Sequence, residues 1–277
     1  MSACADISSE VRRKISILFE EERKRQISDY VREKGRASVQ ELANHFQVSE
    51  STVRRDLRDL EEQELLRRTH GGAVAVMPDD NSEPSFVEKE DRFQQQKMDI
   101  AREALSLIHE GDSIMLDSGT TTYYLAKLIR NFQRLTVVTN SVMVAQELAN
   151  EKNIELLLTG GTLRPETLAM VGPFAERAIA SVHVDKLFLA TNGFDLEAGL
   201  TTPNLIEAAT KQLMINSANQ VILLADHSKF GWVSFSRFGN PEDITTLITD
   251  FISPEAVQAF EEAGIVVTLA GQGGAAQ

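Results

Sequence analysis

The segment from Ser49 to Arg58 combines hydroxyl and guanidinium side chains at a spacing suited to contacting nucleic acid. If this segment is helical, Val53 and Leu57 lie on one face, with Leu60 one turn further, while the polar side chains project from the other. Guanidinium groups donate to base edges and to phosphates. The pattern therefore predicts a helix that packs on a core and reads DNA with Ser49, Ser51, Thr52, Arg54, Arg55 and Arg58.

A second, shorter helix is expected just before it. Ser38 and Glu41 have the spacing of a capping box that would begin a helix ending near Phe46, and Ser49 is placed to cap the next one. This arrangement is typical of a helix-turn-helix, whose second helix enters the major groove.

The residues after this pair of helices are expected to form a two-stranded wing along the phosphates. Glycines Gly71 and Gly72 would supply the positive φ that a tight hairpin needs. Arg67, Arg68 and His70 are the predicted wing contacts. The alternative is a solvated helix face whose arginines pair with Glu61 and Glu62, but the capped first helix and the basic hairpin favour DNA.

Residues 23–73 resemble the DNA-binding region of the DeoR family of bacterial transcriptional regulators. The most specific parts are VSESTVRRDL, beginning at Val48, and RRTHGGA, beginning at Arg67. One departure is Glu64, which stands where the family commonly has glycine. We expect an altered wing angle there, because a non-glycine residue needs another C-cap geometry or tolerates left-handed strain.

Composition favours two domains and a reducing compartment. The 277 residues carry a formal charge of -13, yet residues 1–73 hold 14 basic and 14 acidic side chains and the remainder hold 14 and 27. An acidic body behind a basic reading face can still bind DNA, since counterion release depends on the phosphates contacted. The single cysteine, Cys4, excludes disulfides within the chain, and the absence of an 18-residue apolar run argues against a membrane partner. We expect a cytoplasmic protein.

The second part of the chain has the pattern of a parallel α/β domain. Continuous apolar runs of strand length alternate with helical stretches, which is typical of strands covered on both faces. These runs lie at 113–117, 135–139, 154–159, 185–191, 220–226 and 245–250. We predict an N-terminal extension at 1–22, a winged helix-turn-helix at 23–75, a linker at 76–90 and a Rossmann-like, mostly parallel α/β sensor domain at 91–277.

Several of these strands end in loops able to hold a polar ligand. Ligands of open parallel sheets bind outside the carboxyl ends of the strands, and a glycine followed by hydroxyls at a helix start suits an anion. The first three loops supply the candidates Asp117, Ser118, Gly119, Thr120, Thr121, Thr139, Asn140, Gly160 and Gly161. An isolated loop of this kind would only cap a helix; three on one sheet edge favour a binding site.

Later loops add further candidates to the same site, namely Arg164, Asn192, Gly193, Thr201, Thr202, Asp226 and Lys229. Lys229 and Arg164 could bind a phosphate or a sugar hydroxyl, although a lysine considered alone is more often on the surface. Glu207 and Lys211 are four residues apart on a predicted helix, so an ion pair on the helix surface and a contact with sugar hydroxyls both remain open.

This half also resembles the DeoR family, in its sensor domain, which is related in fold to ribose-5-phosphate isomerase. The matching segments are LDSGTTT, VVTNS, TGGTLR, GLTT and ADHSKF. The resemblance implies a repressor of a carbohydrate-utilisation operon that binds double-stranded operator DNA and responds to a phosphorylated sugar. Because a single helix-turn-helix reads only a short half-site, we expect a homodimer or homotetramer. We expect no cofactor, no metal and no catalytic residues. The alternative is a sugar-phosphate isomerase-like enzyme with an appended DNA-binding module.

Overall fold

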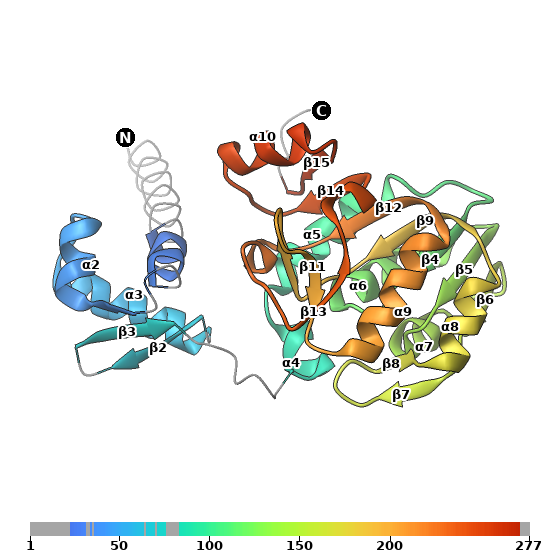
Figure 1. The fold of residues 1–277 in the computed structure, drawn as a ribbon, viewed down its shortest axis with the longest axis horizontal. Coiled ribbons are helices and arrows are strands. Elements are labelled where there is room, and N and C mark those ends of the chain that lie inside the picture. The colour runs from blue at the N-terminus through green and yellow to red at the C-terminus, as the bar shows by residue number, and fades with distance from the viewer. Residues whose placement is uncertain are drawn as a thin grey trace, which may run out of the picture. The chain divides into compact units, whose positions relative to one another are not determined.

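The computed structural model describes residues 23–31, 34, 36–63, 65–69, 71–75 and 83–271 (Figure 1). These belong to two compact units, Met1–Ser82 and Glu83–Gln277. No helix among the described residues is long and apolar enough to cross a membrane.

The first unit is a winged helix-turn-helix. Helical residues 23–31 precede β1 (Arg36–Ser38), α2 (Val39–His45) and α3 (Glu50–Glu62), and β2 (Leu66–Thr69) and β3 (Gly72–Ala75) form the wing. The antiparallel sheet has the order β1-β3-β2, so a third strand that the sequence did not suggest completes the wing. The capping box of Ser38 and Glu41 and the cap by Ser49 are both present, as expected.

The core of this unit includes the predicted apolar face of α3. Val53, Leu57 and Leu60 are buried among side chains from every element of the unit. On the same helix Asp56 is fully buried and accepts two hydrogen bonds from Arg23, at 2.6 and 3.1 Å. This paired contact orients α3 from the side opposite its arginines.

The expectation about the wing glycines was wrong for Gly72, whose φ is not positive. The φ of Gly71 involves His70, which lies outside the described residues, so that part stays a prediction. A Cβ atom on Gly72 would lie 2.1 Å from the carbonyl oxygen of Ala37, so glycine is needed there because β1 and β3 approach closely.

The second unit is built on a seven-stranded parallel sheet. In spatial order its strands are β15 (Val266–Leu269), β14 (Thr246–Thr249), β12 (Ala218–Leu224), β9 (Val184–Leu189), β4 (Ser113–Leu116), β5 (Leu135–Thr139) and β6 (Ile154–Leu158). The six predicted strands are all present, and β15 adds a seventh. The predicted mostly parallel α/β class is confirmed.

Helices cover both faces of this sheet, as continuous apolar strands require. Residues alternate between the faces: Ile114 and Leu116 pack with one cluster and Met115 with the other. The first cluster contains residues of α5 (Gln94–Leu105), α6 (Thr120–Leu128) and α7 (Val142–Leu148). The second contains residues of α8 (Pro173–Ala180), α9 (Leu205–Asn216) and α10 (Pro254–Glu262).

Short elements complete the unit around the central sheet. They are a hairpin of β7 (Thr162–Arg164) and β8 (Ala169–Val171), a small sheet of β10 (Gly193–Asp195), β11 (Gly199–Thr202) and β13 (Ser236–Gly239), the 3-10 turns η1 (Ile129–Asn131), η2 (His227–Lys229) and η3 (Pro241–Asp243), and α4 (Phe86–Asp91). Helix α4 begins inside the stretch expected to be linker and ends one residue beyond it, because Ser85 and Glu88 form a capping box that begins it.

Candidate functional site

The exposed face of α3 carries the predicted DNA-reading side chains. Ser51, Arg54, Arg55 and Arg58 are exposed, opposite the buried face of the helix. Ser49 accepts a hydrogen bond from the backbone N–H of Thr52 and its hydroxyl lies 2.8 Å from that of Ser51, so the cap and the reading face share residues.

The ion pair of Arg54 differs from those of the solvated-helix alternative. Arg54 pairs with Glu50, one turn earlier, at 2.9 Å. Glu61 instead accepts from the backbone N–H of Arg68 at 2.8 Å and lies 3.6 Å from its guanidinium. Glu61 therefore fixes the first wing strand against α3. The Arg67 side chain, His70 and Glu64 lie outside the described residues, so their predicted roles stay predictions.

The second candidate site lies where the strand order of the parallel sheet reverses. From β4 the chain continues to β5 and β6 on one side of the sheet, whereas β9, which comes next in the sheet along the chain, lies on the other side of β4. Asp117 bridges these two strands, since its N–H donates to Phe188 O at 3.1 Å and its carboxylate accepts from Ala190 N–H at 3.0 Å. Such a reversal is the position at which open α/β sheets bind ligands.

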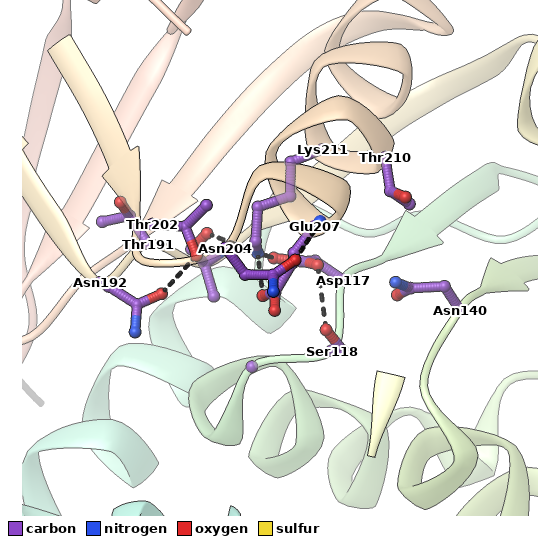
Figure 2. A network of polar contacts seen from close by, with 12 residues as sticks. Asp117, Ser118, Asn140, Thr191, Asn192, Thr202, Asn204, Glu207, Thr210 and Lys211 are labelled. Carbon is purple, nitrogen blue, oxygen red and sulfur yellow. Dashed lines mark hydrogen bonds and ion pairs between the residues drawn. The ribbon is translucent and has the colours of Figure 1, made fainter. Parts of the chain in front are cut away.

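A buried chain of charges extends from this point, as Figure 2 shows. Lys211 donates to the Asp117 carboxylate and to Ala190 O, and its Nζ lies 3.8 Å from Glu207. Arg164 donates to Glu207 at 2.7 Å. Glu207 and Lys211 are only 3% exposed, which rules out the ion pair on the helix surface.

Burial and neighbouring charges shift the pKa values of Glu207 and Lys211 in opposite directions. Burial raises the pKa of Glu207 despite the nearby Lys211 ammonium. Burial alone would lower the pKa of Lys211, but the carboxylates of Asp117 and Glu207 outweigh it and raise that pKa. Lys211 is therefore a permanent cation that compensates two buried acids.

The chain of charges continues to Glu83, a residue of the expected linker. Its carboxylate accepts from Arg164 at 2.9 Å, from Lys89 at 2.5 Å and from the Asn192 amide at 3.1 Å. The other end of the Asn192 side chain accepts from the Thr202 hydroxyl at 3.1 Å (Figure 2). The structure thus joins six predicted effector residues, Asp117, Ser118, Arg164, Asn192, Thr202 and Glu207, through contacts that include Glu83 and Lys89.

The start of α6 offers donors for an anion beside this network. Its N-cap, Gly119, has no side chain to cap the helix, and the backbone N–H groups of Thr120, Thr121 and Thr122 find no acceptor among the described residues. The hydroxyls of Thr120 and Thr121 likewise have no partner there, whereas that of Thr122 donates to Asp117 O and Gly119 O. Uncompensated amides at a helix start favour phosphate or carboxylate groups.

Asn140, at the end of β5, adds an unpaired acceptor. The residue is fully buried, its amide nitrogen donates to Met170 O at 3.2 Å, and its side-chain oxygen has no hydrogen-bond partner within the part of the chain that the structure describes. Figure 2 shows this side chain pointing toward Asp117 and Ser118. Because a buried polar atom without a partner is costly, a ligand hydroxyl donating to it would relieve that cost.

Other predicted residues support the site without facing it. A Cβ atom on Gly119, Gly161 or Gly193 would meet Ala190 Cβ at 2.3 Å, Val171 O at 2.7 Å or Trp232 O at 2.1 Å. These three glycines allow segments of the protein to approach each other. Gly160, which directly precedes Gly161, has a φ of 66°. Three polar side chains are engaged within the fold: Thr139 donates to Leu116 O, Thr201 accepts from Ser234 N–H, and Asp226 caps η2.

Lys229 and Lys97 bring more positive charge to the same end of the sheet. The half-buried Lys229 interacts electrostatically with Asp226, Lys89 and Lys97. Burial lowers the pKa of Lys97 to about 8, and its ammonium donates to the backbone oxygens of Lys89 and Arg92. Sequence reasoning missed Glu83, Lys89 and Lys97; the capping box that begins α4 was the one signal that could have located the first two.

A surface hollow of about 420 Å³ lies between α6 and α7. No residue of the charged network lines it. At the strand ends, the position that Arg164, Lys89 and Asn192 surround is filled by the Glu83 carboxylate.

Two family descriptions match this chain. The "DeoR-like helix-turn-helix domain" matches residues 23–78 and the "DeoR C terminal sensor domain" matches residues 92–251.

Curated relatives match over nearly their whole length. The uncharacterized HTH-type transcriptional regulator YulB of Bacillus subtilis is 41% identical, covering 89% of this chain and 95% of that protein. The HTH-type transcriptional regulator GlpR of Haloferax volcanii is 42% identical, covering 89% and 96%. The HTH-type transcriptional repressor GlcR of Bacillus subtilis is 36% identical, covering 86% and 92%.

Among solved structures, ribose 5-phosphate isomerase A of Methanocaldococcus jannaschii is 16% identical, with a TM-score of 0.36 over 50% of this chain and 54% of that chain. A likeness of this degree supports no inference about activity.

Proposed function

Because this chain belongs to the DeoR family of transcriptional regulators, we propose that it represses a carbohydrate-utilisation operon and that a phosphorylated sugar controls its DNA affinity. Residues 23–75 read the operator through α3 and the wing, in a homodimer or homotetramer, since one helix-turn-helix reads only a short half-site. Residues 91–277 hold the effector. The enzyme alternative is set aside because relatives matching both parts of the chain are named as transcriptional regulators or repressors.

Two features at the point where the strand order reverses support the effector proposal. The start of α6 has no side-chain cap, and the side-chain oxygen of Asn140 has no hydrogen-bond donor among the described residues. The α6 amides and the Thr120 and Thr121 hydroxyls suit a phosphate, while the Asn140 oxygen suits a sugar hydroxyl. Lys229, half-buried at the same end of the sheet, adds attraction for an anion.

We expect one sugar phosphate from a panel to stabilise the protein and to change its operator affinity. A ligand at 100 times its dissociation constant adds about 2.7 kcal/mol to the free energy of unfolding, which thermal-shift screening detects. The Thr120→Val, Thr121→Val double variant should bind that ligand at least about tenfold more weakly, because hydrogen bonds to a charged phosphate are worth roughly 1.5–3 kcal/mol each.

The control for this double variant is Thr136→Val, which removes a hydroxyl from β5 that lies 3.4 Å from Glu155, outside the network. Both proteins should bind the operator like the wild type when no ligand is present. If the double variant responds to the ligand as the control does, the α6 loop is not the phosphate site.

A further inference from the structure

The Glu83 carboxylate lies inside the candidate effector site although it is the first residue of the second unit. Its side chain is 5% exposed, and its three donors come from α4, β7 and the loop after β9. A carboxylate held by an ammonium, a guanidinium and an amide has the surroundings that proteins use to bind phosphate or carboxylate ligands.

The charges of this network balance only while Glu83 is in place. Along the contacts, the acids Asp117, Glu207 and Glu83 alternate with the bases Lys211, Arg164 and Lys89. Removing the Glu83 carboxylate would leave Lys89 without its ion-pair partner and Arg164 with only Glu207, which it shares with Lys211, and the exposed Glu166. Since Lys89 and Arg164 are both mostly buried, another anion would have to take its place.

Building on the proposed function, we propose that Lys89, Arg164 and Asn192 form a second anion subsite, which Glu83 occupies when no effector is bound. The effector places one anionic group at the α6 amides and a second one here, and so displaces Glu83. The effector class is then a sugar derivative with two anionic groups, such as a bisphosphate or a phosphorylated sugar acid.

This displacement would also carry the signal toward the DNA-binding unit. Glu83 follows the last wing strand by eight residues in the chain, so the same carboxylate that fills the subsite anchors the segment leading to that unit. A ligand that takes the place of Glu83 releases this anchor. Effector binding and the anchored state are then mutually exclusive, which is the differential contact that coupling requires.

The Glu83→Gln variant tests the subsite with inorganic phosphate as the probe. Glutamine keeps the shape of the side chain but removes its charge, so phosphate no longer competes with a carboxylate. We expect phosphate to raise the thermal unfolding midpoint of the full-length variant at concentrations at least tenfold lower than for the wild type. Operator affinity without any ligand should also change, in the direction that the effector changes it.

Two further variants make the result specific. Glu166→Gln removes a carboxylate that lies 3.5 Å from the same arginine but is 47% exposed, and it should behave as the wild type. Adding Lys89→Met to Glu83→Gln should abolish the gain in phosphate binding. Equal phosphate responses of Glu83→Gln and the wild type would overturn the subsite, and an unchanged operator affinity would overturn its coupling.

The outcomes separate this proposal from the function on which it rests. If a sugar phosphate alters operator binding by the wild type but Glu83→Gln gains no phosphate response, only the subsite fails. If Glu83→Gln gains the phosphate response but no sugar phosphate or sugar bisphosphate alters operator binding, the subsite stands and the proposed function fails.

Discussion

Replacing Arg54 and Arg55 together by alanine should weaken binding to the specific operator by about 2–6 kcal/mol, because each specific base contact contributes roughly 1–3 kcal/mol. This corresponds to a loss of roughly 30-fold or more in affinity. Both arginines are exposed on the face of α3 opposite Val53, Leu57 and Leu60. The ion pair of Arg54 with Glu50 is exposed and contributes only about 0.3–0.5 kcal/mol, so the domain should remain folded.

Fluorescence anisotropy with an operator fragment and a scrambled fragment measures this effect, with thermal unfolding as the check on folding. Arg68→Ala provides the contrast, since a wing arginine is expected to contact phosphate. It should weaken binding to both fragments alike. The slope of the logarithm of affinity against the logarithm of salt concentration should fall by about one, the contribution of one phosphate contact. If the double arginine variant binds the operator fragment with wild-type affinity, the exposed face of α3 does not read the DNA bases.

Replacing Lys211 by methionine should lower the free energy of unfolding by roughly 3–5 kcal/mol, the usual cost of removing one partner of a buried ion pair. The lysine is 3% exposed, and its loss leaves the buried Asp117 carboxylate without its ion-pair partner and leaves Glu207 with Arg164 alone. Urea unfolding measures the change. Arg102→Met, which removes a 56% exposed partner of Asp99, should cost far less.

The pH dependence of the Lys211→Met variant follows from the same charges. Burial already raises the pKa of Glu207 above its ordinary 4.5, so the folded protein holds more protons than the unfolded chain above that pH, and stability falls as pH rises through this window. Without Lys211 this effect should grow. The variant should therefore lose more stability at pH 8 than at pH 5, and adding Asp117→Asn should restore part of the loss. A small loss that does not vary with pH would contradict the role given to Lys211.

Local sequence patterns predicted most of the fold because each element carries its own signal. The cap residues Ser38 and Ser49 located the reading helices, and continuous apolar runs located six of seven central strands. The seventh, β15, also has an apolar sequence, but the predicted series stopped before it. Strands β10, β11 and β13 are three or four residues long and lack the continuous apolar runs that identify the central strands.

The candidate site was only partly predictable because its contacts join distant residues. Lys211 and Asp117 are 94 positions apart, and no local pattern pairs them. Glu83 was assigned to a linker because Pro, Asp and Ser residues surround it, although its partners Arg164 and Asn192 lie far along the chain. The reason for a glycine at position 119 was equally ambiguous in the sequence. The absence of a side chain there could make room for a ligand or for the neighbouring Ala190.

Calorimetric titration of one sugar phosphate into the free protein and into its operator complex tests the central claim most directly. If the strand-end site controls DNA binding, the two dissociation constants must differ, by the factor by which the ligand changes operator affinity. For an inducer we expect weaker ligand binding to the operator complex, typically 5–150-fold for coupling of about 1–3 kcal/mol. Equal dissociation constants in the two titrations would show that this ligand does not regulate DNA binding, and would contradict the account.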